Sequence, residues 1–188
     1  MASNSPYSAA LGSSSRQYSL ISTSSDACLL LTAGWLNICV SERLLCHQVT
    51  SLPGALPTRL VDVGPLYGSL PPISHKKIEN TAYLALSHCW GAAKVLQMKG
   101  SNFDYLRRCI NIDDLTVTFQ HAVFTTRRLG YRYLWIVSLC ITQDSPHDWE
   151  IESQKMAKVY GNSHLAITAL WGFIQNGGVN ASRKSLGT

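Results

Sequence analysis

The chain has 188 residues, a length that suits one domain of ordinary size with flanking segments. Hydrophobic residues make up 46% and charged residues 14%, which excludes a largely disordered chain and favours a substantial buried core. The formal charge is +5 at pH 7, but the basic residues occur as scattered pairs. A nucleic-acid-binding surface needs cations gathered on one face, so we expect no nucleic-acid partner.

The first part of the chain changes character near residue 26. Residues 1–25 hold ten serines and one charged residue, Arg16, which predicts a disordered arm without the basic start of a secretory signal. The apolar residues between 26 and 45 predict one helix, and the prolines and glycine that follow predict a linker up to residue 56. We therefore expect an N-terminal helix and linker over residues 26–56.

The next elements are shorter. Residues 59–63 predict a strand that Gly64-Pro65 ends, and residues 68–80 predict a loop. The continuous apolar run 83–87 is typical of a buried parallel strand. Asp114 is predicted to cap a helix that runs to residue 129, with Gly130 as its C-terminal stop.

The last elements complete an alternating pattern. Residues 133–137 predict a second buried strand, and residues 164–170 a third. Between them, Ser145, Pro146 and Asp148 form a capping signal for a helix that extends to about residue 160. The alternation of strands and helices predicts an α/β fold, a small parallel sheet with flanking helices in a three-layer, flavodoxin-like arrangement.

Cysteine usage and hydropathy limit the other classes. The six cysteines show no C-x-x-C pair and no regular spacing, so we expect reduced thiols in a cytoplasmic protein. A zinc site from Cys39, Cys46 and His47 would lack a fourth ligand, and we predict no metal. The apolar run 27–40 is shorter than the roughly 18 residues that a membrane span needs, so we predict no membrane association.

Three long motifs follow one another in order. They are Tyr83-x-Ala85-Leu86-Ser87-His88-Cys89-Trp90-Gly91, then Thr118-Phe119-Gln120-His121-Ala122 with 127–136, and then 138–144 with Asp148-Trp149-x-x-Glu152-Ser153 up to Tyr160. They resemble the blocks of fungal heterokaryon-incompatibility (HET) domains, and residues 35–64 resemble the segment that commonly precedes them. The resemblance covers about residues 35–170. We expect a HET domain over residues 57–172, with a motif-bearing core at 83–170 and a flexible tail at 173–188.

This resemblance implies an allorecognition module that signals growth arrest or programmed cell death. It implies protein partners or self-association, in the cytoplasm. Two departures leave open a degenerate, inactive member that modulates longer relatives: Val137 stands where the family usually has aspartate, and Val117 replaces its usual proline. In that case, Val137→Asp would restore toxicity.

Polar residues follow the first two strands of the predicted parallel sheet. Ser87, His88 and Trp90 lie at the end of one strand, and Ser138 and Cys140 at the end of the next. Open parallel sheets bind ligands beyond these carboxyl ends. We therefore take Ser87 and His88 as candidate catalytic residues, and Trp90, Ser138 and Cys140 as candidate ligand-binding residues. The competing interpretations are a buried apolar role for the thiol, and hydrogen bonds to turn backbone for Ser87 and Ser138. For the rings, they are a hydrogen-bonded core role for His88 and a core or interface role for Trp90.

Glu152 is the third candidate catalytic residue. It lies on the same helical face as Trp149 and Met156, and we take Trp149 as a further ligand-binding candidate. A carboxylate on an apolar face must be paired or reach a cleft. HET domains have been likened to TIR domains, in which a helical glutamate shortly after a tryptophan serves NAD-glycohydrolase chemistry. That analogy alone implies NAD as the substrate and Glu152 as the residue that acts on it.

The competing interpretation of Glu152 is structural: a salt bridge to Arg132 or Arg128, or a surface side chain whose carboxylate reaches the solvent. The two interpretations predict different surroundings for the carboxylate. A cleft that gathers Ser87, Ser138 and Glu152 would favour an enzyme. A closed surface with Glu152 in an ion pair would favour a signalling module that works through protein contacts.

Overall fold

The computed structural model describes residues 23, 25–42, 57–64, 73–74, 81–90 and 94–169. Its elements in chain order are α1 (Asp26–Glu42), β1 (Leu60–Asp62), β2 (Ile73–Ser74), β3 (Tyr83–His88), α3 (Phe103–Arg108), the 3₁₀ turn η2 (Ile112–Asp114), α4 (Val117–Arg128), β4 (Tyr133–Ile136), α5 (Val137–Cys140), α6 (Pro146–Ser153), α7 (Met156–Gly161) and β5 (Leu165–Ala169). The predicted tail, most of the predicted arm and nearly all of the linker lie outside the described residues.

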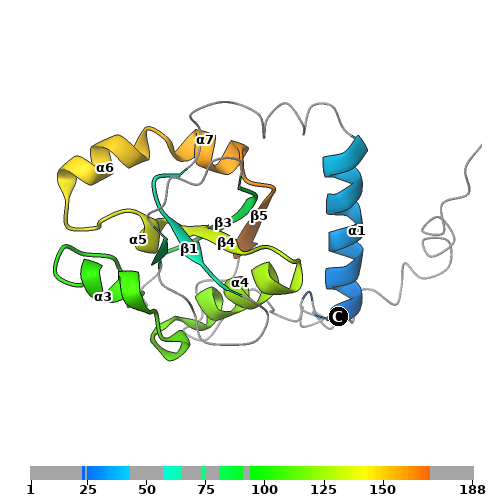
Figure 1. The fold of residues 1–188 in the computed structure, drawn as a ribbon, viewed down its shortest axis with the longest axis horizontal. Helices are drawn as coiled ribbons and strands as arrows, with labels where there is room; N and C mark the ends of the chain where they lie inside the picture. The colour runs from blue at the N-terminus through cyan, green and yellow to red at the C-terminus, as the bar shows by residue number, and fades with distance from the viewer. Residues whose placement is uncertain are drawn as a thin grey trace, which may run out of the picture.

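The strands form one five-stranded sheet in the order β2-β1-β4-β3-β5 (Figure 1). The three strands predicted to be parallel are so: β3 pairs in parallel with β4 on one side and with β5 on the other. The predicted α/β fold is therefore confirmed. The sheet is mixed, however, because β1 pairs antiparallel with both β4 and β2. The β2 strand lies inside the segment predicted to be a loop.

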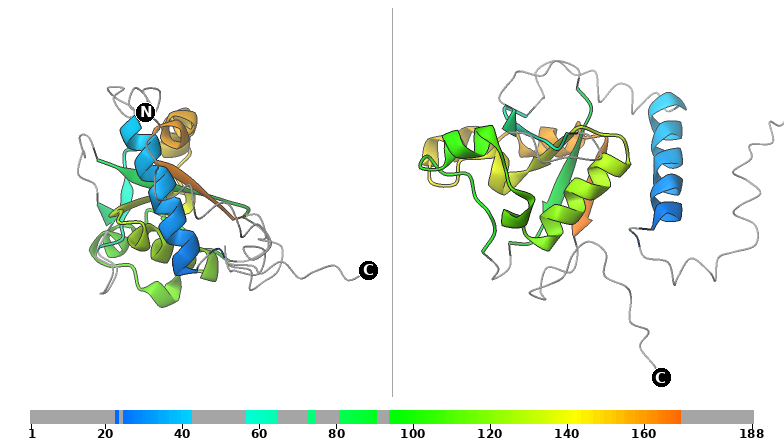
Figure 2. Two further views of the ribbon diagram at one scale, coloured as in Figure 1. Left: turned by 90° about the vertical axis from the view of Figure 1, so that its right-hand side faces the viewer. Right: turned by 60° about the horizontal axis from the view of Figure 1, so that its bottom comes forward.

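Helices cover both faces of the sheet, as the three-layer prediction requires. On one face, the Tyr83 hydroxyl donates to the carbonyl of Val159 at 2.6 Å, and the rings of Trp135 and Tyr160 meet edge to face at 5.3 Å, so α7 covers this side. His88 lies an odd number of residues from Tyr83 and therefore faces the other way, where its ring meets Phe119 of α4. Figures 1 and 2 show α4 and α7 on opposite sides of the strands.

The core is built from the apolar strand residues between these helices. Leu84, Leu86, Leu134 and Ile136 are fully buried on the α4 side. Burial of one such side chain is worth about 1.5–3 kcal/mol, which explains why short strands of four to six residues suffice here.

Helix boundaries differ from the prediction in two places. The N-cap of α4 is Thr116, whose hydroxyl accepts from the amide of Phe119 at 3.4 Å, because Asp114 belongs to the preceding 3₁₀ turn. Gly130 ends this region with φ 81°, as its position predicts. The single helix predicted up to residue 160 is divided into α6 and α7, although Ser145 caps its start as expected.

Helix α1 stands to the side of the sheet where β5 lies (Figures 1 and 2). Leu29 and Leu36 are its buried residues, and Asp26 forms an ion pair with Arg128 at the end of α4. Among the described residues, no helix has both the length and the apolar character that crossing a membrane requires.

Candidate functional site

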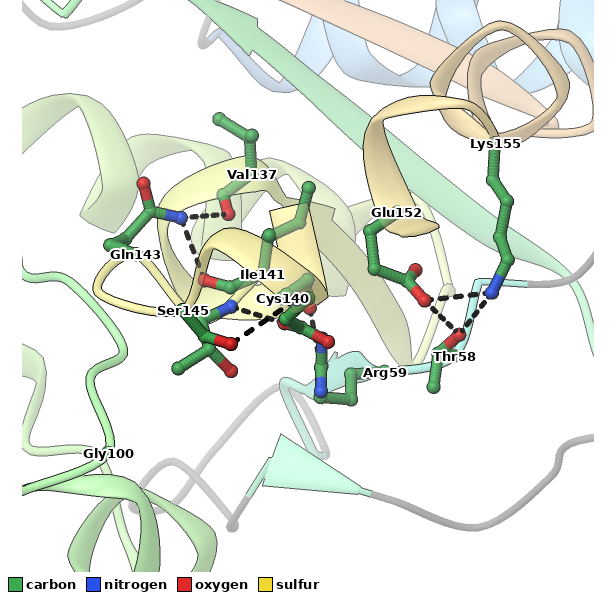
Figure 3. Close-up of polar contacts among 12 residues, drawn as sticks. Thr58, Arg59, Gly100, Val137, Cys140, Ile141, Gln143, Ser145, Glu152 and Lys155 are labelled. Atoms are coloured by element: carbon green, nitrogen blue, oxygen red, sulfur yellow. Dashed lines mark hydrogen bonds and ion pairs between the residues drawn. The ribbon is translucent and has the colours of Figure 1, made fainter. Parts of the chain in front are cut away.

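Glu152 is held in a closed polar cluster with Thr58 and Lys155 (Figure 3). One carboxylate oxygen accepts from the Thr58 hydroxyl at 2.6 Å and lies 2.8 Å from the ammonium of Lys155, while Lys155 also donates to Thr58 at 3.1 Å. Only 5% of the Glu152 side chain is exposed. The salt bridge predicted as the alternative therefore exists, but its partner is Lys155 and not Arg132 or Arg128.

A second, partly buried ion pair lies beside this cluster. The Arg59 guanidinium pairs with Asp148, and its Nε donates to the carbonyl of Cys140 at 2.6 Å. Asp148 also accepts from the backbone amide of Thr142 at 2.7 Å. Burial alone would raise the pKa of the Asp148 carboxyl, but the hydrogen bonds from Arg59 and Thr142 outweigh it and hold this pKa below its usual value. The pair fixes the start of β1 against α5 and α6.

Cys140 is shielded within the same region. Its thiol is fully buried and accepts from the amide of Ile136 at 3.5 Å. Burial raises the pKa of this thiol to about 12, so it is not a thiolate at neutral pH. Its burial fits the apolar role.

The end of β3 has a different character. The imidazole of His88 lies edge to face with Phe119, ring centroids 4.9 Å apart, and 6.0 Å from the ring of Trp90. Both imidazole nitrogens are buried and have no hydrogen-bond partner among the residues that the structure describes. Burial lowers the pKa of His88, which keeps the ring neutral. Its neighbour Ser87 lies on the opposite face, on the side of Tyr160, whose hydroxyl donates to the carbonyl of Leu86 at 3.2 Å.

The segment of residues 94–100, called the strap, contacts α5 and the loop that follows it. The amide of Met98 donates to the carbonyl of Ser138 at 2.8 Å, and the amide of Gln143 donates to the carbonyl of Met98 at 2.8 Å. The Asp144 carboxylate accepts from the amide of Gly100 at 2.9 Å and anchors the end of the strap. Ser138 is fully buried, and within the described part of the chain its Oγ has no hydrogen-bond partner.

The structure thus divides the predicted site. His88, Trp90 and Ser138 lie at the carboxyl end of β3 and β4, whereas Glu152 contacts Thr58 and Lys155. Trp149 is partly buried against the core. Among the described residues, no group of three histidine, cysteine or acidic side chains gathers in a way that could hold a metal ion. Cys46 and His47 lie outside the described residues.

Sequence reasoning missed the partners of the buried acids. Thr58 is 94 residues from Glu152, and Arg59 is 89 residues from Asp148. The available signal was an arginine at the start of an apolar strand segment, since such a charge needs a buried acid nearby.

These features define an α/β domain with a parallel core, a buried glutamate on a helix and a Ser-His-Cys-Trp segment at the end of β3. A family model described as Heterokaryon incompatibility protein (HET) matches residues 83–185, and the chain belongs to this family. Neither the curated proteins nor the solved structures contain a match to the chain.

Proposed function

We propose that this chain is a signalling module of fungal non-self recognition, and that its engaged state starts growth arrest or programmed cell death. It works through contacts with protein partners or with further copies of itself. Membership of the HET family supports this role. Cys28, Cys89, Cys109 and Cys140 form no disulfide within the described residues, which fits the reducing cytoplasm as the place where the chain acts.

The sealed carboxylate of Glu152 is the observation that carries the choice between signalling and catalysis. A glutamate that binds a sugar hydroxyl and stabilises a developing positive charge must reach the substrate. The Glu152 carboxylate instead meets the Thr58 hydroxyl and the Lys155 ammonium and is 5% exposed. This burial supports a structural role for Glu152 and a signal that needs no cleavage of NAD.

Three strains of a fungal host test this proposal. They carry an inducible wild-type chain, the Glu152→Gln variant or an empty vector, and growth is followed at equal protein levels. Glutamine keeps an acceptor for Thr58. We expect the wild type and Glu152→Gln to arrest growth alike. Arrest by the wild type and normal growth with Glu152→Gln would support a TIR-like hydrolase instead. Normal growth with both chains would support the degenerate member.

A further inference from the structure

A hollow of about 430 Å³ lies on the solvent-facing side of α6 and α7, which follow one another in the chain (Figure 1). Gln154 and Lys155 join the two helices, and both keep helical backbone angles, so one face continues from α6 into α7. The residues that line the hollow recur at helical spacing along this face. They are His147, Glu150, Ile151, Gln154, Lys155 and Lys158.

The two ends of this hollow carry opposite charges. Lys155 and Lys158 bring ammonium groups to the α7 end, and Glu150 brings a carboxylate to the α6 end. Both Glu150 and Lys158 are exposed, and among the described residues the side chain of neither has an ion-pair or hydrogen-bond partner. Ile151 adds an apolar side chain that is 40% exposed. The hollow therefore offers contacts for an anion, for an apolar group and for a cation.

Lys155 is held in place before any ligand arrives. Its ammonium lies 2.8 Å from Glu152 Oε1 and donates to the Thr58 hydroxyl at 3.1 Å (Figure 3). An ammonium has three N–H donors, so one is left for a further acceptor. A side chain that is already fixed loses less conformational entropy when a ligand binds. Because Glu152 offsets the charge of Lys155, Lys158 supplies the net positive charge at this end.

The distance between the charged ends selects the shape of the occupant. Lys158 lies eight residues after Glu150, which is a rise of about 12 Å along a helix. In an extended peptide, side chains four residues apart point to the same side and are separated by about 13 Å. Gln154 lies midway and offers an amide that can both donate to and accept from a peptide backbone. An extended peptide thus matches the hollow in both length and charge.

We propose that this hollow binds an extended segment of a partner protein that carries an acidic and a basic side chain four residues apart, with an apolar side chain between them. The acidic side chain meets Lys155 and Lys158, and the basic one meets Glu150. The apolar side chain packs on Ile151. This inference rests on the proposed function, because it names the kind of partner through which the chain signals, but peptide binding can be measured without growth arrest.

Titration of the ¹⁵N-labelled full chain with the blocked peptide acetyl-Ser-Glu-Ser-Leu-Ser-Lys-Ser-amide, followed by NMR, tests the hollow. We expect saturable shifts within residues 147–158. Replacing the peptide's lysine by glutamate, or its leucine by serine, should weaken binding about two- to fivefold, since each contact is partly exposed. Lys158→Glu and Glu150→Lys should each weaken it about fivefold or more, because each turns an attraction into a repulsion. Lys99→Glu reverses an exposed charge outside the hollow and should bind as the wild type does.

An exchange of charges distinguishes direct contact from damage to the fold. A peptide with lysine at both charged positions should bind Lys158→Glu more tightly than it binds the wild type, a gain that a misfolded variant could not show. Absence of saturable shifts with the wild type would overturn the proposal. So would equal binding of the original peptide and the peptide with two glutamates, because it would show a site for an anion alone.

The outcome for the hollow is distinct from the outcome for the signalling role. If the chain arrests growth but the wild type binds no peptide, the hollow proposal fails and the signalling role stands. If the peptide binds with the expected dependence on charge while the chain is harmless in the host, the hollow proposal stands and the signalling role fails.

Discussion

Lys155 Nζ lies 2.8 Å from Glu152 Oε1, three residues further along the chain, and both groups also contact the hydroxyl of Thr58. This arrangement ties the segment before β1 to the junction of α6 and α7. Glu152 is buried while 41% of the Lys155 side chain is exposed, so the pair differs from a solvent-exposed salt bridge. Its main effect is to satisfy the buried acid.

Removal of this acid should cost stability. Glu152→Ala leaves the part-buried Thr58 hydroxyl without its acceptor, and we expect a loss of about 1–3 kcal/mol in the free energy of unfolding. Glu152→Gln should lose less, because its amide oxygen still accepts from Thr58. Urea unfolding of both variants checks this order. An alanine variant as stable as the wild type would show that the cluster is not structural.

The Arg59–Asp148 pair should contribute more to the free energy of unfolding than the Glu152–Lys155 pair does. The reason is that only 10% of the Arg59 side chain is exposed. Arg59→Met leaves Asp148 without its cation and the Cys140 carbonyl without a donor, so we expect a loss of about 3–5 kcal/mol at pH 7. Urea unfolding at pH 7 gives this value. Lys99→Met, a change at an exposed lysine, is the control and should stay within about 0.5 kcal/mol of the wild type. A loss equally small for Arg59→Met would contradict a structural ion pair.

The lowered pKa of Asp148 also predicts how the stability of the fold depends on pH. Its pKa is lower in the folded protein than in the unfolded chain, so its contribution is present above the unfolded value and disappears as the pH falls through the folded value. Asp148→Asn should therefore flatten the loss of stability below about pH 4. Thermal unfolding between pH 2 and 5 measures the difference, and identical pH profiles for both proteins would refute this assignment.

The histidines His88 and His164 affect the stability of the fold in a higher pH range than Asp148 does. Burial lowers the pKa of both rings in the folded state, whereas the unfolded chain takes up these protons near pH 6.5. Unfolding therefore binds protons below about pH 6.5, and stability should fall as the pH drops through this region. His88→Phe should remove part of the slope between pH 5 and 6.5 and leave the part from His164. An unchanged slope in the variant would show that His88 is not buried as a neutral ring.

Val137 offers a test of the degenerate-member interpretation. Its side chain is buried in the core at the start of α5. Val137→Asp should destabilise the fold by about 2–4 kcal/mol, and more at pH 7 than Val137→Asn does, because burial penalises a charge most. Unfolding of both variants at pH 7 and pH 4 gives these values. A stable Val137→Asp protein that becomes toxic would contradict our account and support an inactive natural chain.

Much of the fold could be predicted because local patterns are strong where the core is. The apolar runs at 83–87 and 133–137 form β3 and β4, and Ser145 starts α6. Local sequence patterns did not predict the elements that depend on tertiary contacts. The two-residue strand β2 has no local signal long enough to predict it, and Val137 opens a one-turn helix instead of ending a strand, because β4 stops at Ile136.

The candidate site was harder to predict for the same reason. Sequence alone placed Ser87 and His88 at the end of one strand, but alternation sends them to opposite faces, toward Tyr160 and Phe119. Glu152 was recognised as an acid that needed a partner. That partner, Lys155, was close in sequence, but the hydroxyl of Thr58 that completes the cluster comes from a distant segment.

The most direct test of the central claim is the level of cellular NAD in a fungal host at the moment when expression of the full chain stops growth. A signal carried by protein contacts, with Glu152 in a structural ion pair, predicts that NAD stays at the level of the empty-vector strain. A fall in NAD that precedes arrest, and that Glu152→Gln abolishes at equal protein level, would contradict this account and make Glu152 a catalytic residue.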